Sequence, residues 1–217
     1  MSNQEEQLTR KKLEKEQVRL SEARILPLDK KEKREIIKKF MNKPEWEKFE
    51  QIVMEDIKHS RSLVNSLNIW GTLMKNEDLS RRFLIYNLHI GSHLSLPERD
   101  REILILRNAW LCRSEYEWGQ HSVFGEQAGL SNDEIIRIIE GPDAEEWNSF
   151  DSTLLRAVDE LHNDAFISKV TWEDLAERYN TNQLIDLVFT VGNYHILALA
   201  MNTFGVQLEE GKKGFPK

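Results

Sequence analysis

Apolar side chains recur at spacings of three and four residues along most of the chain, which is the period of a helix with one buried face. Asp29 is placed to cap a helix that runs to Phe40, and Pro44 suits the first turn of the next helix. That second helix carries apolar residues at helical spacing: Trp46, Phe49, Ile52, Val53 and Ile57. The sequence has no alternating strand pattern of comparable strength and no glycine-rich phosphate loop, so it predicts an all-α fold.

Helix starts are marked by three segments in which a hydroxyl side chain precedes an acidic residue by three positions. Segments 95–98 (Ser-Leu-Pro-Glu) and 131–134 (Ser-Asn-Asp-Glu) predict capping boxes, in which the two side chains bond each other's backbone N–H groups. Segment 171–174 (Thr-Trp-Glu-Asp) is a weaker version of the same pattern. We therefore expect helices to begin near these three segments.

The final helix is expected from about Thr181 to Thr203, with a stop near Gly205. Its residues leave little polar surface around the helical turn, which is typical of a helix buried on most sides. A central helix of this kind requires a shell of other helices. The sequence therefore predicts a helical bundle with a buried C-terminal helix.

The first 24 residues are rich in Lys, Arg, Glu and Gln, and they predict a charged helical arm ahead of a folded domain at 25–217. The 40% apolar fraction and six tryptophans indicate a folded core, and no run approaches the roughly 18 uninterrupted apolar residues of a membrane helix. The net charge of −7 argues against nucleic acid or an anionic membrane as a partner. Because the N-terminus does not resemble a signal sequence, we expect a cytoplasmic protein.

A candidate reaction centre lies in the octet from Ser114 to His121. In a helix, Ser114, Glu117 and His121 share one face. A carboxylate and an imidazole one turn apart can share a proton, so Glu117 and His121 are candidates for acid–base chemistry. A structural explanation is also open, because Ser114 and Glu117 have the spacing of a capping box.

Two further polar residues lie in apolar helical segments, and each has two explanations. Glu102 lies in a long apolar run and is a candidate catalytic carboxylate, but with Arg101 and Arg107 nearby it also fits an exposed, salt-bridged face. His195 lies in the most apolar helix, where it forms either a buried polar network or a second wall of a pocket.

Cys112 is the only cysteine, so we expect neither an intrachain disulfide nor a cysteine-based metal site. A catalytic zinc needs at least three well-placed ligands, and the sequence has no His-Glu-x-x-His pattern. We therefore expect neither a metal nor another cofactor. A nucleophilic role for Ser114 or Cys112 lacks the sharp glycine-flanked turn that such residues usually occupy.

Several segments together resemble the carboxymuconolactone decarboxylase family, which includes alkylhydroperoxidase D. They are 101–107 (Arg-Glu-Ile-Leu-Ile-Leu-Arg), 116–118 (Tyr-Glu-Trp) with His121, 128–131 (Ala-Gly-Leu-Ser), and 134–135 (Glu-Ile). The resemblance extends over most of residues 24–211. It implies an all-helical, alkylhydroperoxidase D-like fold and a homo-oligomer, either a trimer, a hexamer or a dimer.

The chain departs from this pattern at the redox residues of the alkylhydroperoxidase branch. That branch uses a glutamate, two cysteines spaced C-x-x-C, and a histidine four residues after the second cysteine. Here Ser114 and Glu117 stand at the cysteine places, while Glu102 and His121 match the glutamate and the histidine. Peroxide reduction of that kind requires an attacking thiolate and a resolving thiol, so the resemblance favours the decarboxylase branch.

The resemblance and the residues together predict acid–base chemistry on a small lactone-type carboxylic acid. We assign His121 as the proton donor, Glu117 as its partner, and Glu102 as an orienting or relaying group. Possible substrate-binding residues are Arg101, Arg107, Ser114, Tyr116 and His195. Two alternatives remain open: a redox protein in which Cys112 works with an external thiol, and a non-catalytic helical oligomer.

Overall fold

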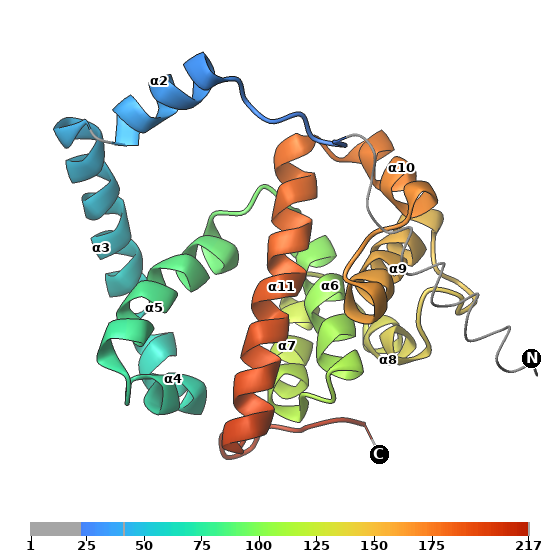
Figure 1. Cartoon of the computed structure of the whole chain (residues 1–217). Helices are drawn as coiled ribbons and strands as arrows, with labels where there is room; N and C mark the ends of the chain where they lie inside the picture. The colour runs from blue at the N-terminus through green and yellow to red at the C-terminus, as the bar shows by residue number, and fades with distance from the viewer. Residues whose placement is uncertain (1–22, 41, 217) are drawn as a thin grey trace, which may run out of the picture. The chain divides into compact units, whose positions relative to one another are not determined.

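The computed structural model describes residues 23–40 and 42–216, and these residues form ten helices and no strand (Figure 1). The all-α prediction is therefore confirmed. The chain divides into two compact units, residues 1–51 and 52–217, each of which is described by itself. The predicted charged arm lies almost wholly outside the described residues, and the predicted boundary at residue 24 stays a prediction.

The described part of the first unit contains helix α2 (Lys30–Phe40) and the start of α3 (Lys43–Ser66). Asp29 caps α2 as predicted, because its Oδ1 accepts hydrogen bonds from the backbone N–H groups of Lys31 and Glu32 at 2.7 and 2.8 Å. Pro44 lies in the first turn of α3, where its missing N–H costs no helical hydrogen bond.

In the second unit, α6 (Glu98–Leu111) is the central helix. It packs against α7 (Glu115–Gln127), α8 (Asn132–Glu140), α9 (Ser149–Asp164) and α11 (Thr181–Phe204) (Figure 1). Each of its residues from Glu102 to Ala109 is buried. The uninterrupted apolar run in this helix is thus the signal of a helix enclosed on all sides.

The remaining helices of the second unit are α4 (Asn68–Leu73), α5 (Glu77–Ser92) and α10 (Lys169–Arg178). Helix α4 packs on α5, which contacts α11, and α10 packs on α9. The larger apolar core surrounds α6 and α9, and a smaller one forms around Trp70, Tyr116, Leu197 and Met201. The candidate residues of α6 and α7 lie close to both cores.

Helix α11 occupies the predicted segment and ends at Gly205, whose φ of 65° is the left-handed conformation of a helix stop. Its burial is confined to one face, because Phe189 is 54% exposed and Leu199 is 58% exposed. Within the described residues, α11 alone is long and apolar enough to cross a membrane. Its buried face packs against α5, α6, α7 and α9.

The three predicted capping segments have different outcomes. The box at 131–134 forms as predicted and opens α8. Ser95 instead bonds Asp186 of α11 through its N–H and its hydroxyl, and α6 begins after Pro97 without a side-chain cap. Helix α10 is capped by Ser168, so the cap predicted at 171–174 is wrong. At 95–98, a contact with a residue distant in sequence replaces the expected local bond. At 171–174, a serine three residues earlier caps the helix instead.

Candidate active site

A cavity of about 410 Å³ opens between the end of α3 and helices α4, α5, α6, α7 and α11. Much of its wall is apolar, including Val64, Trp70, Leu88 and Leu197. Its polar lining includes six residues of α6 and α7, namely Arg101, Glu102, Tyr116, Glu117, Gln120 and His121. An apolar pocket with a few converging polar groups is the usual form of a small-molecule site.

The strongest polar contact of this wall joins Glu102 to His121. The distance from His121 Nδ1 to Glu102 Oε2 is 2.7 Å, and Glu102 is only 1% exposed. Burial raises the pKa of the Glu102 carboxyl, but the interactions with His121 and Arg101 outweigh burial and hold it below the ordinary value. Glu102 is therefore an ionised acceptor, which assigns a proton to His121 Nδ1 and leaves Nε2 as the nitrogen available to a ligand.

The imidazole of His121 is also held by aromatic rings. Tyr194 meets it edge-on with ring centroids 4.8 Å apart, and Phe124 does so at 5.4 Å. Both rings line the same cavity. The hydrogen bond and the two edge contacts together fix the ring orientation, which acid–base catalysis requires.

Glu117 is the second buried carboxyl of the cavity, and its partner differs from the prediction. It is 2% exposed, and its Oε1 accepts a hydrogen bond from Asn108 Nδ2 at 3.1 Å. Its Oε2 has no hydrogen-bond partner among the described residues. Burial raises the pKa of Glu117 well above its ordinary value, which favours the protonated form of this carboxyl.

The predicted pairing of Glu117 with His121 is therefore wrong, although both line the cavity. Glu102, from the neighbouring helix, forms the hydrogen bond with His121 Nδ1 that was predicted for Glu117. The alternative of an exposed, salt-bridged face for Glu102 is also wrong, because the carboxyl is buried. Arg101 does contact it, at 3.3 Å from Nε to Oε1.

Ser114 and Arg107 lie outside the cavity. Ser114 occupies the N-cap position of α7, but its buried hydroxyl makes no cap bond and has no partner among the described residues, so the capping-box interpretation is wrong. The guanidinium of Arg107 is held by Asp159 at 2.6 and 2.8 Å and by the carbonyls of Ile138 and Ile139. It fastens α8 and α9 to α6, and the substrate-binding prediction for it is not supported.

Arg101 and Tyr116, the other predicted binding residues on this wall, do reach the cavity. Arg101 Nη1 donates to the carbonyl of Gly91 at 2.8 Å. The hydroxyl of Tyr116 donates to Glu209 Oε1 at 2.5 Å, and Gln120 donates to the same carboxylate. The C-terminal segment that carries Glu209 passes close over α7 at Gly119, where an added Cβ would lie 2.5 Å from the carbonyl oxygen of Lys213.

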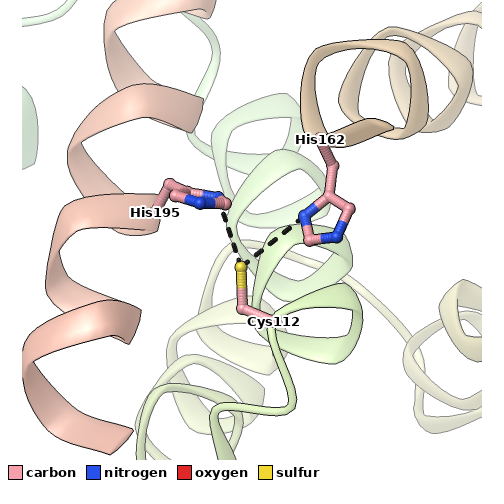
Figure 2. A group of neighbouring side chains, drawn as sticks. All are labelled: Cys112, His162 and His195. Carbon is pink, nitrogen blue, oxygen red and sulfur yellow. Dashed lines mark hydrogen bonds between the residues drawn. The ribbon is translucent and has the colours of Figure 1, made fainter. Parts of the chain in front are cut away.

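Cys112 and His195 meet each other away from the cavity (Figure 2). The distance from Cys112 Sγ to Nδ1 is 3.3 Å for His195 and 3.7 Å for His162. Burial, and then the Glu117 carboxyl, raise the pKa of the Cys112 thiol to about 12. The pocket-wall prediction for His195 is therefore not supported, and His162 was not predicted as a site residue.

The sequence interpretation missed two residues of functional interest. Tyr194 faces the cavity where His195 was expected, because consecutive helical residues point about 100° apart. Asn108 donates to Glu117 and lies 3.6 Å from Cys112 Sγ through its Oδ1, so it joins the two clusters. The sequence could have indicated Asn108, because an amide inside the apolar run of α6 requires hydrogen-bond partners.

Comparison with known proteins identifies the fold. No protein-family model matches the sequence, and a search of curated proteins finds no significant match. Among solved structures, a protein of unknown function from Agrobacterium tumefaciens, described as a candidate AhpD antioxidant-defence protein, is 14% identical with a TM-score of 0.59. The match covers 64% of this chain and 95% of that one.

The debrominase Bmp8 has a similar fold. Its ligand-free structure is 16% identical with a TM-score of 0.54, and the match covers 66% of this chain and 77% of that one. A cysteine-to-alanine variant bound to 2,3,4-tribromopyrrole is 15% identical with a TM-score of 0.56, covering 88% and 94%. The predicted alkylhydroperoxidase D-like fold is thereby confirmed.

Proposed function

We propose that this chain is an enzyme that performs acid–base chemistry on a small organic acid, with His121 as the proton donor. The observation that carries the proposal is the 2.7 Å contact between His121 Nδ1 and the buried Glu102 carboxylate at the wall of an open cavity. A carboxylate behind an imidazole fixes its tautomer and balances the charge of its protonated form. An open cavity with these groups counts against a purely structural helical oligomer.

The second polar group, Glu117, suits a different role from His121. Its Oε2 has no partner among the described residues, and in the protonated form that burial favours it can donate a hydrogen bond to a carbonyl or carboxylate oxygen of a ligand. Arg101 lines the same wall beside Glu102, and its guanidinium can donate to a ligand carboxylate. The polar groups thus favour a substrate with a carboxylate, and the apolar groups favour a compact carbon skeleton.

The reaction that the family resemblance favours is decarboxylation of a small unsaturated lactone acid. The carbon–carbon bond to the carboxylate breaks, carbon dioxide leaves, and the electron pair is delocalised into the conjugated lactone. His121 Nε2 first takes a proton from solvent and then gives it to carbon, while Nδ1 keeps its own proton towards Glu102. The debrominase of similar fold binds tribromopyrrole, and this supports a small ring as the ligand.

A redox function for Cys112 has weaker support. Its thiol does not line the cavity, and a thiol with a pKa of about 12 supplies very little thiolate at neutral pH. This alternative requires loss of activity in Cys112→Ser.

Self-association through the outer face of α11 is also proposed. The exposed apolar residues of this face are Ile185, Val188, Phe189, Ile196 and Leu199. A contiguous apolar surface of this kind usually marks an interface. Light scattering after gel filtration should show an oligomer for the native chain and a smaller species for Phe189→Glu, and an unchanged mass for both would contradict the proposal.

Carbon dioxide release from a panel of small lactone acids tests the enzymatic proposal. The native chain should release carbon dioxide from at least one of them, and His121→Ala should be at least about a hundredfold slower. Circular dichroism should show unchanged helicity in the variant. Equal turnover by His121→Ala would exclude His121 as the proton donor, and no turnover of any acid would exclude this decarboxylation.

A further inference from the structure

The cluster of Cys112, His162 and His195 plays no part in the acid–base proposal (Figure 2). Cys112 ends α6, His162 lies in the last turn of α9, and His195 lies within α11. One potential ligand atom from each residue lies within 4.8 Å of the other two. Within the described residues, this is the one group of three such donors that converges so closely.

The two sulfur–nitrogen distances fit a shared metal ion. Zinc–sulfur bonds of about 2.3 Å and zinc–nitrogen bonds of about 2.05 Å at a tetrahedral angle place sulfur about 3.6 Å from each nitrogen. The observed distances from Cys112 Sγ, 3.3 Å to His195 and 3.7 Å to His162, lie on either side of that value. The three donor atoms lie within 4.8 Å of one another, so the two imidazoles would close around one ion by side-chain rotation.

Three polar atoms lie near the sulfur of Cys112: Asn108 Oδ1, which accepts from the thiol, and the Nδ1 atoms of His162 and His195. A single cation bound to sulfur and both nitrogens would replace the two sulfur–nitrogen contacts. Asn108 would then remain as a partner that orients the cysteine, a role that commonly strengthens metal sites.

The backbone of Cys112 is fixed, because its carbonyl accepts a hydrogen bond from Asn202 Nδ2 at 2.8 Å.

We propose that Cys112, His162 and His195 form a binding site for one divalent transition-metal ion of the zinc class. Binding exchanges the thiol proton for the ion, so that one S–H bond breaks, one sulfur–metal bond forms and one proton enters solvent. The three side chains are only partly buried, which leaves a fourth position for water or an exogenous ligand. The sequence predicted no cysteine-based metal site because it has one cysteine. The proposed site instead combines that cysteine with two histidines from other helices.

Cobalt(II) titration of the tag-free chain tests this site, because a thiolate bound to cobalt gives a charge-transfer absorption. The native chain should bind one equivalent with that absorption, and Zn²⁺ should displace it. Cys112→Ser should abolish the absorption. His162→Gln and His195→Gln should each weaken binding by at least about a hundredfold, since loss of a direct ligand costs at least as much as loss of an orienting partner.

His59→Gln is the matched control, because His59 is an exposed histidine outside the cluster, and it should bind as the native chain does. A second measurement needs no variant: Zn²⁺ should slow alkylation of the native chain, whose only thiol is Cys112. Absence of the charge-transfer absorption, or native affinity in Cys112→Ser, would overturn the proposal. Alkylation at an unchanged rate in saturating Zn²⁺ would also overturn it.

Discussion

Helix α6 contributes to two polar clusters that differ in charge and in surroundings. At the cavity, Glu102 is an ionised carboxylate held by His121 and Arg101. At the other cluster, Cys112 is a protonated thiol beside two imidazoles and away from the cavity. The first arrangement suits proton transfer, and the second suits metal binding. Asn108, which contacts Glu117 and Cys112, lies between them.

The largest expected effect is a difference in kcat between a variant of the cavity cluster and a variant of the thiol cluster. His121→Ala should lower kcat by about 10² to 10⁴, because it removes the proton donor while leaving the cavity open. Cys112→Ser, the matched change in the other cluster, should leave kcat within about twofold. Steady-state kinetics with an acid from the panel provide the measurement, and a reversed order of effects would move the reaction to the thiol cluster.

A smaller effect is expected at the C-terminal segment over α7. Gly119→Ala places a Cβ against the Lys213 carbonyl and Leu208, so it should lower the free energy of unfolding by about 1–3 kcal/mol. Displacement of the segment should also weaken the Glu209 contact with Tyr116 and raise KM. Gly192→Ala is the control, since a Cβ there meets open space. Urea unfolding that shows equal stability for both variants would contradict this packing.

The two cavity carboxyls should change stability with pH in opposite directions. Glu117 has a raised pKa in the folded chain, so its contribution is fullest below the ordinary value of 4.5 and declines as pH rises towards the raised value. Glu117→Gln should therefore gain stability relative to the native chain over that range, by up to about 1.4 kcal/mol per pH unit.

Glu102 has a lowered pKa, so it stabilises the fold above its unfolded value and loses that contribution as pH falls through the folded value. Glu102→Gln should be less stable than the native chain at neutral pH, and the difference should shrink in acid. Thermal unfolding from pH 3 to 8 measures both variants. Parallel pH profiles for the two would refute the assignment of charge states.

The smallest effect is expected for the thiol cluster without metal. Cys112→Ser should change the free energy of unfolding by less than about 1 kcal/mol, because the site is half-buried and its contacts are weak. Added Zn²⁺ should then stabilise the native chain but not Cys112→Ser. Equal stabilisation of both chains would place the ion elsewhere.

Local patterns predicted the fold well where the determining contacts are local. The box at Ser131, the cap at Asp29 and the stop at Gly205 depend on neighbouring residues, and all three formed. Helical spacing and the resemblance selected Glu102, Glu117 and His121 as candidates, and the structure brings all three to one cavity. The AhpD-like fold was therefore predictable.

The failures concern partners that are distant in sequence. Ser95 bonds Asp186, and Glu102 replaces Glu117 as the partner of His121. His195 turns towards Cys112 and His162, from two other helices. Periodicity gives the face of a helix approximately, but tertiary packing decides which neighbour that face meets.

The most direct test of the central claim is a ¹H–¹⁵N spectrum of the histidine side chains during titration with a panel acid that the chain turns over. We predict that His121 carries its proton on Nδ1 in the ligand-free chain. Its Nε2 signal should shift on binding, while His162 and His195 stay unchanged. A proton on Nε2 alone, or shifts confined to His162 and His195, would contradict an acid–base centre at His121 and Glu102.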